Sequence, residues 1–524
     1  MKSRLTLSYG LRWQILPGFR EDGGNLANFD QRNNSIVVPD ALAGYLTSQN
    51  ITSSNVAFQQ SFNACPSGKT AGSSAHGLPC TGYITASQDG LPQSLRRTYK
   101  GNFQPRLAIA YRPFNDTKTV VRAGFGIYTM TNLGPLSFNN SGNPTSNLHT
   151  YSNSNSAGQN TPQIVFPNTA PVSSGGQTFG GGGLDQGVDP NYRDPQSNQW
   201  NVTVERQLTN ATSLRASYVG MHTYRLSITE DLNQIPASAT PYNTGATAGA
   251  FVDSRAPYQN WTTLLSTFNA GEANYHAFEV QATHRLEHGL YVDVNYTYAK
   301  SVADNQGDVP SAFAGEVNYG LPIADRFHIK QNLGNVSGTR RNRMLLTGVY
   351  QLPFGKGRQY MNTGTATDLF LGGWDLTTIT LLETGPWLTP SISGSADQSN
   401  TNVVNRSAAL RPDVVPKGTA GAVTYNNLSF LATPAGAGRF GNAGVGIIQG
   451  PGTAAVSLGV AKRFAISEKV HARFETTFTN LLNHTNFAPP VTAIDNSLFG
   501  QLTGPQTAEN AGNRTGQAAL RIDF

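Results

Sequence analysis

The run His284-Arg285-Leu286-Glu287-His288 matches the H-x-x-E-H signature of inverted zinc proteases. That chemistry needs both histidines on one face of a helix. Apolar and polar residues instead alternate singly around the run, and Gly289 follows it directly. A two-residue period indicates a strand, and glycine permits a tight turn. We therefore interpret the run as the end of a strand that enters a turn, and we expect no metal site and no catalytic site there.

Other residues that could do chemistry are few. Cys65 and Cys80 lie in one polar stretch and could form a local disulfide in an oxidising compartment, but without a histidine cluster they make no zinc site. Asp304 and Asp308 could bind a cation, although solvated loop charges are the interpretation we favour. The glycines at 180–183 have no strand before them, so we interpret them as loop rather than phosphate cradle. We expect no enzyme and no cofactor.

The composition favours a β-rich protein with large polar loops. Charged residues make up 13% of the 524 residues, against about 25% in typical soluble domains. The chain has 55 glycines and 10% aromatic residues, and its mean hydropathy is −0.33. No apolar run of about 18 residues occurs, which excludes a helical membrane span. The net charge is +6, but lysine and arginine are scattered, so we expect no nucleic acid partner.

Alternating segments carry the organisation of the chain. We predict strands over 5–13, 103–111, 119–129, 199–208, 214–218, 276–286, 290–298, 342–352, 374–382, 454–464, 470–479 and 517–524. The connections between them are alternately long and short, which is typical of outer-membrane barrels. The predicted fold is all-β: an antiparallel up-and-down transmembrane β-barrel, partial, with about twelve visible strands, long extracellular loops and short periplasmic turns. A lipid-embedded sheet must pair every backbone group, so the barrel must close.

The last predicted strand resembles the closing strand of bacterial outer-membrane barrels. Leu520, Ile522 and Phe524 are its apolar positions. The resemblance implies that they form the signal recognised by the barrel-assembly machinery, with Phe524 at the periplasmic rim. The alternative is an ordinary edge strand of a soluble sheet.

The polar positions of the strands carry charges that would face the lumen if the apolar positions meet lipid. Two explanations stay open: contact with a plug or attraction of anionic solutes, and ion pairing that only solvates the interior. Trp13, Trp200, Tyr218, Tyr296, Tyr298, Tyr350 and Trp374 are candidates for interfacial aromatic girdles. The candidate lumen-facing charges are Arg12, Arg106, Arg122, Glu205, Arg215, Glu279, Arg285, Asp293, Arg473, Glu475 and Arg521.

Several stretches, taken together and in order, resemble the Oar-like TonB-dependent transporters, a family of outer-membrane receptors. They are Ser3–Arg12, Asn102–Arg106, Gln199–Val202, Tyr296–Ser301, Gly348–Gly357 and Phe478–Phe487. The resemblance implies a cell outer membrane location, contact with lipid and lipopolysaccharide, and energy-coupled uptake or export of an unidentified solute. It also implies a larger barrel, a plug domain and a TonB motor as partners.

We expect residues 1–524 to be one outer-membrane barrel domain, the C-terminal portion of such a receptor, without plug or regulatory-like domain. No apolar signal segment precedes the first predicted strand, which favours a chain whose natural start is missing. Two alternatives from other classes are a secreted or surface β-rich glycan-binding adhesin and, with less support, a β-rich hydrolase.

Overall fold

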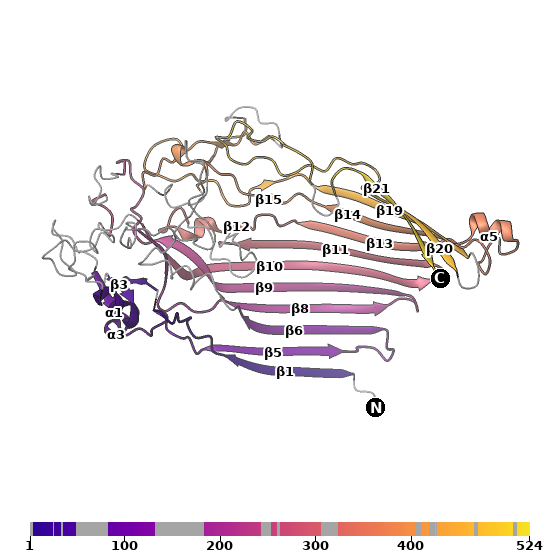
Figure 1. Ribbon diagram of the computed structural model, residues 1–524, viewed down its shortest axis with the longest axis horizontal. Coiled ribbons are helices and arrows are strands. Elements are labelled where there is room, and N and C mark those ends of the chain that lie inside the picture. The colour runs from indigo at the N-terminus through magenta and orange to yellow at the C-terminus, as the bar shows by residue number, and fades with distance from the viewer. Residues whose placement is uncertain are drawn as a thin grey trace, which may run out of the picture.

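The computed structural model describes residues 4–24, 26–32, 35–48, 82–130, 183–242, 253–258, 263–304, 323–401, 403, 410–418, 425, 427–465, 470–506 and 511–524. One large antiparallel sheet dominates this part of the chain (Figure 1). Twelve of its strands lie side by side in chain order, so every neighbouring pair is joined by one connection. No helix in the described ranges is long and apolar enough to cross a membrane.

The twelve consecutive strands correspond to the twelve predicted segments, and this prediction is confirmed. Two short strands, β7 (Gly183–Val188) and β12 (Gly334–Asn335), join the same sheet beside β10 and β11 and were not predicted. The twelve strands are β1 (Leu5–Gln14), β5 (Asn102–Tyr111), β6 (Thr119–Thr129), β8 (Gln196–Gln207), β9 (Thr212–Asp231), β10 (Thr263–Glu287), β11 (Leu290–Ala303), β13 (Asn342–Gln351), β14 (Trp374–Glu383), β19 (Thr453–Ala465), β20 (His471–Thr479) and β21 (Thr515–Asp523).

Long and short connections lie at opposite ends of the strands, as predicted. Residues 112–118, 208–211 and 288–289 are tight links at one end, here called the short-turn rim. The connection 352–373 lies at the same end and contains the helix α5 (Thr365–Leu371). Figure 1 places α5, the start of β1 and the end of β21 together at this rim. The other end, the long-loop rim, receives the connections of thirty residues or more, such as 15–101 and 384–452.

Two neighbouring strands are longer than predicted. β9 has 20 residues and β10 has 25, whereas a tilted membrane strand needs about 9–11. Their short-turn ends are aligned with the other strands, so the excess extends beyond the long-loop rim. The register between them shifts on both sides of Gly271, and Arg225 opposite has φ +62°. A bulge therefore separates the membrane-length part of the hairpin from its extension.

Part of the connection after β1 is folded, which corrects the expectation of an open polar loop. It holds β2 (Asn28–Asp30), β3 (Ser35–Val38), β4 (Gly82–Thr85), α1 (Asp40–Ser48) and α3 (Ala86–Asp89). Phe29, Ile36 and Val38 are buried against Leu232 and Leu264, which follow β9 and begin β10. We call this unit the first rim cap. Its apolar core fixes it to the extension of the β9–β10 hairpin.

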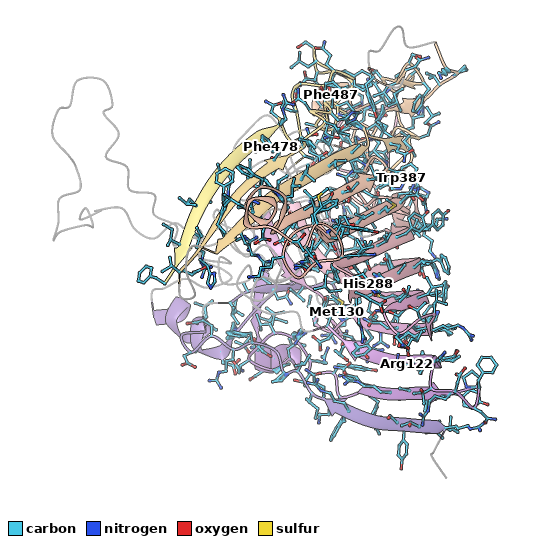
Figure 2. All side chains as sticks on the ribbon, turned by 90° about the vertical axis from the view of Figure 1, so that its right-hand side faces the viewer. Arg122, Met130, His288, Trp387, Phe478 and Phe487 are labelled. Atoms are coloured by element: carbon cyan, nitrogen blue, oxygen red, sulfur yellow. The ribbon has the colours of Figure 1, made fainter. Side chains whose placement is uncertain are left out.

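A second rim cap forms from the connections after β11, β14 and β20. Its short elements are η2 (Ile329–Asn332), β15 (Trp387–Leu388), η3 (Gly394–Ala396), β16 (Asp413–Val414), β17 (Leu431–Ala432) and β18 (Ile448–Gln449). Leu428, Leu431 and Ile448 are buried in one of its apolar clusters. Seen from the short-turn rim, the strands of the large sheet stand end-on and form a curved wall (Figure 2). We use the name wall for the twelve strands.

Candidate functional site: the polar face of the wall

The register of the wall keeps apolar residues on one face from strand to strand. On β1, Leu7 opposes Ile109, and Ile109 opposes Ala123. The same row continues across four further strands through Val202, Tyr218, Phe278 and Tyr298. Nearer the short-turn rim a second row runs through Leu290, Tyr350, Leu376 and Val460. Because side chains alternate across a strand, all remaining positions form the opposite, polar face.

That polar face collects the predicted charges. Arg12, Arg106, Arg122, Glu205, Arg215, Glu279, Asp293, Arg473, Glu475 and Arg521 all occupy it by register. Arg285 does not lie in the paired register, because a bulge falls between His284 and Glu287 at the end of β10. Two acids that are not among the predicted charges, Glu383 and Asp375, lie on the same face by register. Their strand, β14, alternates weakly, so its faces were hard to assign.

Many of these charges have partners. Arg122 pairs with Glu205 on the neighbouring strand, Arg473 Nη2 lies 3.1 Å from Glu475 Oε2, and Arg521 Nε lies 2.8 Å from Asp523 Oδ1. Asp293 accepts hydrogen bonds from Thr283 Oγ1 at 2.5 Å and from Gln281 Nε2 at 3.0 Å. Ion pairing and polar solvation of the face therefore account for these residues.

Three arginines on β1, β5 and β9 differ from the rest. Within the described residues, no carboxylate pairs with Arg12, Arg106 or Arg215. The Arg106 guanidinium lies 4.8 Å from the centre of the Tyr128 ring, and Arg215 Nε donates to Ser217 Oγ at 3.3 Å. A neutral ring and a hydroxyl leave the charge uncompensated, so this half of the face is basic.

An open trough of about 530 Å³ lies beside Arg106 on β1, β5, β6 and β8. Its polar lining includes Tyr128 and the side-chain amides of Gln199 and Asn201. Glycines make the room: a Cβ on Gly124 would lie 2.7 Å from Asn201 Oδ1, and one on Gly126 would lie 2.9 Å from Tyr128 Cε2. One guanidinium among amides and a phenol suits a polar or anionic group. The described part of the chain holds no group of acids, histidines or cysteines that could bind a metal.

The aromatic girdle candidates divide by height. Trp13 lies at the long-loop end of β1, stacks on Phe103 with ring centres 6.0 Å apart, and donates from Nε1 to Lys100 O at 2.8 Å. Tyr350 and Trp374 lie at the short-turn ends of β13 and β14. The other four lie inside their strands: Trp200, Tyr218, Tyr296 and Tyr298. The girdle assignment stays a prediction.

The remaining predicted residues fall in three places. Leu520, Ile522 and Phe524 lie at the end of β21 and are 65%, 53% and 99% exposed. Cys65 and Cys80, and also Asp308, lie outside the described residues.

The remaining chemical motifs have structural roles. His284 is on a strand, and its Nδ1 lies 2.8 Å from Thr212 Oγ1, while His288 occupies the turn with φ +50°. The strand interpretation of the H-x-x-E-H run is confirmed. Asp304 is not a solvated loop charge as expected, since it is buried and its Oδ1 accepts from Glu272 N at 2.6 Å. Of the glycine run at 180–183, only Gly183 lies in the described residues, and it is the first residue of β7.

A family model described as "Outer membrane beta barrel domain" matches residues 1–517. No curated protein matches the sequence. Among solved structures, the outer membrane transporter YddB from Escherichia coli is similar with a TM-score of 0.40 and 9% identity, over 82% of this chain and 41% of YddB. FpvA of P. aeruginosa, solved with heterologous pyoverdines, has a TM-score of 0.35 and 11% identity, over 82% of this chain and 34% of FpvA. The chain thus spans about two fifths or less of their length.

Proposed function

The chain belongs to the outer-membrane β-barrel domain family and is located in the outer membrane. We propose that it forms part of the barrel wall of an Oar-like TonB-dependent receptor. In this proposal the polar face lines the lumen and the apolar face meets lipid. The wall serves energy-coupled passage of a solute and carries out no covalent chemistry. Residues 1–524 then act as one barrel domain, with the rim caps outside the cell.

One observation carries the proposal: the register keeps apolar residues on one face of the wall and most charges on the other. Three charges on the apolar face, Arg206, Lys300 and Lys462, lie within four residues of a strand end. A soluble sheet buries one face beneath a second layer. Here the apolar side chains Leu11, Leu107 and Phe278 are 70%, 49% and 48% exposed. Exposed apolar side chains at this density favour contact with lipid acyl chains.

The basic half of the polar face supports a proposal about the cargo. Arg12, Arg106 and Arg215 would raise the positive potential on one side of the lumen, which favours an anionic solute or an acidic surface of the plug. The plug, the TonB motor, the barrel-assembly machinery and lipopolysaccharide are the partners we propose in the intact receptor. Leu520, Ile522 and Phe524 are proposed as the contact with the assembly machinery.

The face assignment can be tested with two neighbouring cysteines. In a chain with Cys65 and Cys80 replaced by serine, Ala108→Cys and Leu107→Cys place thiols on opposite faces of β5. Both native side chains are exposed, so neither change opens a cavity. In membranes, a water-soluble maleimide should label position 108 severalfold faster than position 107. Equal labelling of both would mean a sheet wetted on both faces and would overturn the proposal.

The role of the arginines needs the intact receptor. Arg106→Glu with Arg122→Glu reverses two charges on the polar face, and Lys118→Glu makes the same kind of change in the turn 112–118. We expect the double variant to reduce uptake of an anionic solute and docking of the plug, while the turn variant leaves both unchanged. Unchanged uptake and docking in the double variant would mean that these charges only solvate the lumen.

A further inference from the structure

The short-turn rim carries an apolar helix tip. The last turn of α5 exposes Leu369, Phe370 and Leu371, which are 53%, 70% and 44% accessible. Among the described residues, the connections 112–118 and 208–211 at this rim each expose one large apolar residue, Phe114 and Leu208. Figure 1 shows α5 projecting beyond the ends of the strands. Contiguous exposed apolar residues are typical of interaction surfaces, which makes this tip a candidate contact surface.

The contacts of α5 place it on the apolar side of the wall. Trp374 and Lys462 oppose each other on β14 and β19, in the register that carries the apolar face. Trp374 Nε1 donates to the carbonyl oxygen of Phe370 at 2.9 Å. Lys462 Nζ donates to the carbonyl oxygens of Gly372 at 2.6 Å and Phe370 at 3.3 Å. Two side chains from the lipid-facing side therefore hold the C-terminal end of the helix.

Lys462 is suited to an apolar environment. It is 5% exposed, and its ammonium lies 4.8 Å from the centre of the Trp374 ring and 5.2 Å from that of Phe464. A lysine in hydrocarbon directs its head to the nearest polar groups, and here those groups are the carbonyls that end a helix. The contact couples the position of α5 to the membrane-facing surface of β19.

The rest of the connection packs against α5. Lys356 N donates to Asp368 Oδ1 at 2.7 Å, and Asp368 is the acid of α5. Gly355 has φ +101°, and a Cβ there would lie 2.4 Å from the Cα of Gly372. Glycine is required because the loop 353–360 packs directly on the end of the helix. The acid is thus satisfied within the connection, while the apolar tip stays exposed.

We propose that α5 is an interfacial membrane foot, with phospholipid as its partner. Leu369, Phe370 and Leu371 enter the boundary between headgroups and acyl chains of the leaflet at the short-turn rim. Lipid is the partner because the apolar surface is continuous: Trp374 and Lys462 are followed, two residues further along β14 and back along β19, by the apolar pair Leu376 and Val460. The foot rests on the proposed orientation of the wall, and it continues that surface into the interface, where Trp and Lys are common anchors.

The test measures depth in a bilayer. The full chain, with Cys65 and Cys80 changed to serine, is placed in phosphatidylcholine vesicles and labelled with an environment-sensitive fluorophore at Phe370→Cys. Thr363→Cys, exposed in the same connection, is the water-facing control, and Leu107→Cys is the wall control. Lipids with a spin label high on the acyl chain serve as quenchers. We expect quenching at position 370 to exceed that at 363 severalfold.

The outcomes separate the two proposals. Quenching at 107 without quenching at 370 would overturn the foot and would mean that a soluble protein or a second copy covers α5. Quenching at neither position would overturn the wall, and the foot with it. A further variant, Lys462→Met, removes the tie to the carbonyls while keeping an apolar side chain. It should reduce quenching at 370 while leaving quenching at 107 unchanged, and an unchanged signal at 370 would show that Lys462 does not position the helix.

Discussion

The rim caps bury their large apolar side chains, whereas the wall leaves its apolar side chains exposed. Among the residues that the structure describes, the largest fully buried side chains are Tyr192, Phe29, Ile36, Leu95, Leu232, Ile235, Leu264 and Leu428. All of them lie at the long-loop rim, and none lies in the membrane-length part of the wall. The wall instead leaves Leu7, Leu107 and Phe278 about half exposed. The caps are built for water and the wall for a solvent that accepts apolar surface.

Buried ion pairs occur in both regions, and exposed ones also occur in the wall. In the second rim cap, the Asp413 side chain is 8% exposed and pairs with Arg439. On β14 of the wall, the Glu383 side chain is 2% exposed and lies 2.7 Å from Arg343. Arg122 and Glu205, on β6 and β8, pair while 48% and 37% exposed. A buried charge depends on its partner far more than a solvated one does, so substitutions in the two kinds of pair should act differently.

The largest effect is expected in the first rim cap. Phe29→Ala removes a ring that is 2% exposed from the cluster with Ile36 and Val38. Such a cavity costs about 3–5 kcal/mol of folding free energy. Hydrogen exchange should rise across 26–43, while the wall keeps its mobility shift on boiling in gel electrophoresis. A wall that unfolds together with the cap would contradict their independence.

A charge on the lipid side of the wall should have the next largest effect. Val202→Arg places a guanidinium near the middle of β8 on the apolar face, at a cost of about 2–4 kcal/mol at the bilayer midplane. Asn201→Arg, one residue away on the polar face, is the matched control and should change stability little. Denaturant titration in lipid vesicles measures both. Equal destabilisation by the two variants would mean that the two faces of β8 do not differ in their contact with lipid.

The wall could be predicted from sequence because its rule is local. Each strand alternates singly, and chain-order pairing follows from short turns, so the twelve segments suffice to order the sheet. The excess length of β9 and β10 could not be predicted, since the register shifts at Gly271 and the extension packs on residues far away in the chain. The face of Arg285 stays a prediction, because a bulge falls between His284 and Glu287 and the paired register does not include Arg285.

The rim caps were missed because their cores are not local. Asn28 Nδ2 donates to Val188 O at 2.7 Å and Asn28 Oδ1 accepts from Val188 N at 3.0 Å, across 160 positions of the chain. The strands β2 to β4 have at most four residues, too few for a readable period. The three apolar residues of α5 form no periodic pattern in the sequence. Their position depends on contacts with Trp374 and Lys462, and Lys462 is far away in the chain. The polar-face charges were predictable, but which arginines lack an acid depends on the register.

A smaller effect is expected from acid in the second rim cap. Hydrogen bonds from the Arg439 guanidinium, one of them 2.8 Å long, hold the pKa of Asp413 below its usual range. A depressed folded-state pKa adds stability above the unfolded value of about 3.9, and that stability is lost as the pH falls through the folded value. The cap should therefore lose protection from proteolysis below about pH 4. Asp413→Asn should be less stable at neutral pH and show a weaker pH dependence. An identical acid profile in both would contradict the pairing.

The smallest effect is expected from an ion pair of the wall. Arg122 and Glu205 are both more than one third exposed on the polar face, so water and salt compensate either partner when the other is removed. Glu205→Gln should then cost only about 0–1 kcal/mol, and added salt should shrink the difference further. Denaturant titrations at low and high salt measure it. A cost as large as that of a buried pair would mean that this part of the face is closed off from water, against a lumen-lining role. A small, salt-dependent cost would instead place Glu205 in a water-filled lumen, where its charge acts on passing solutes more than on folding.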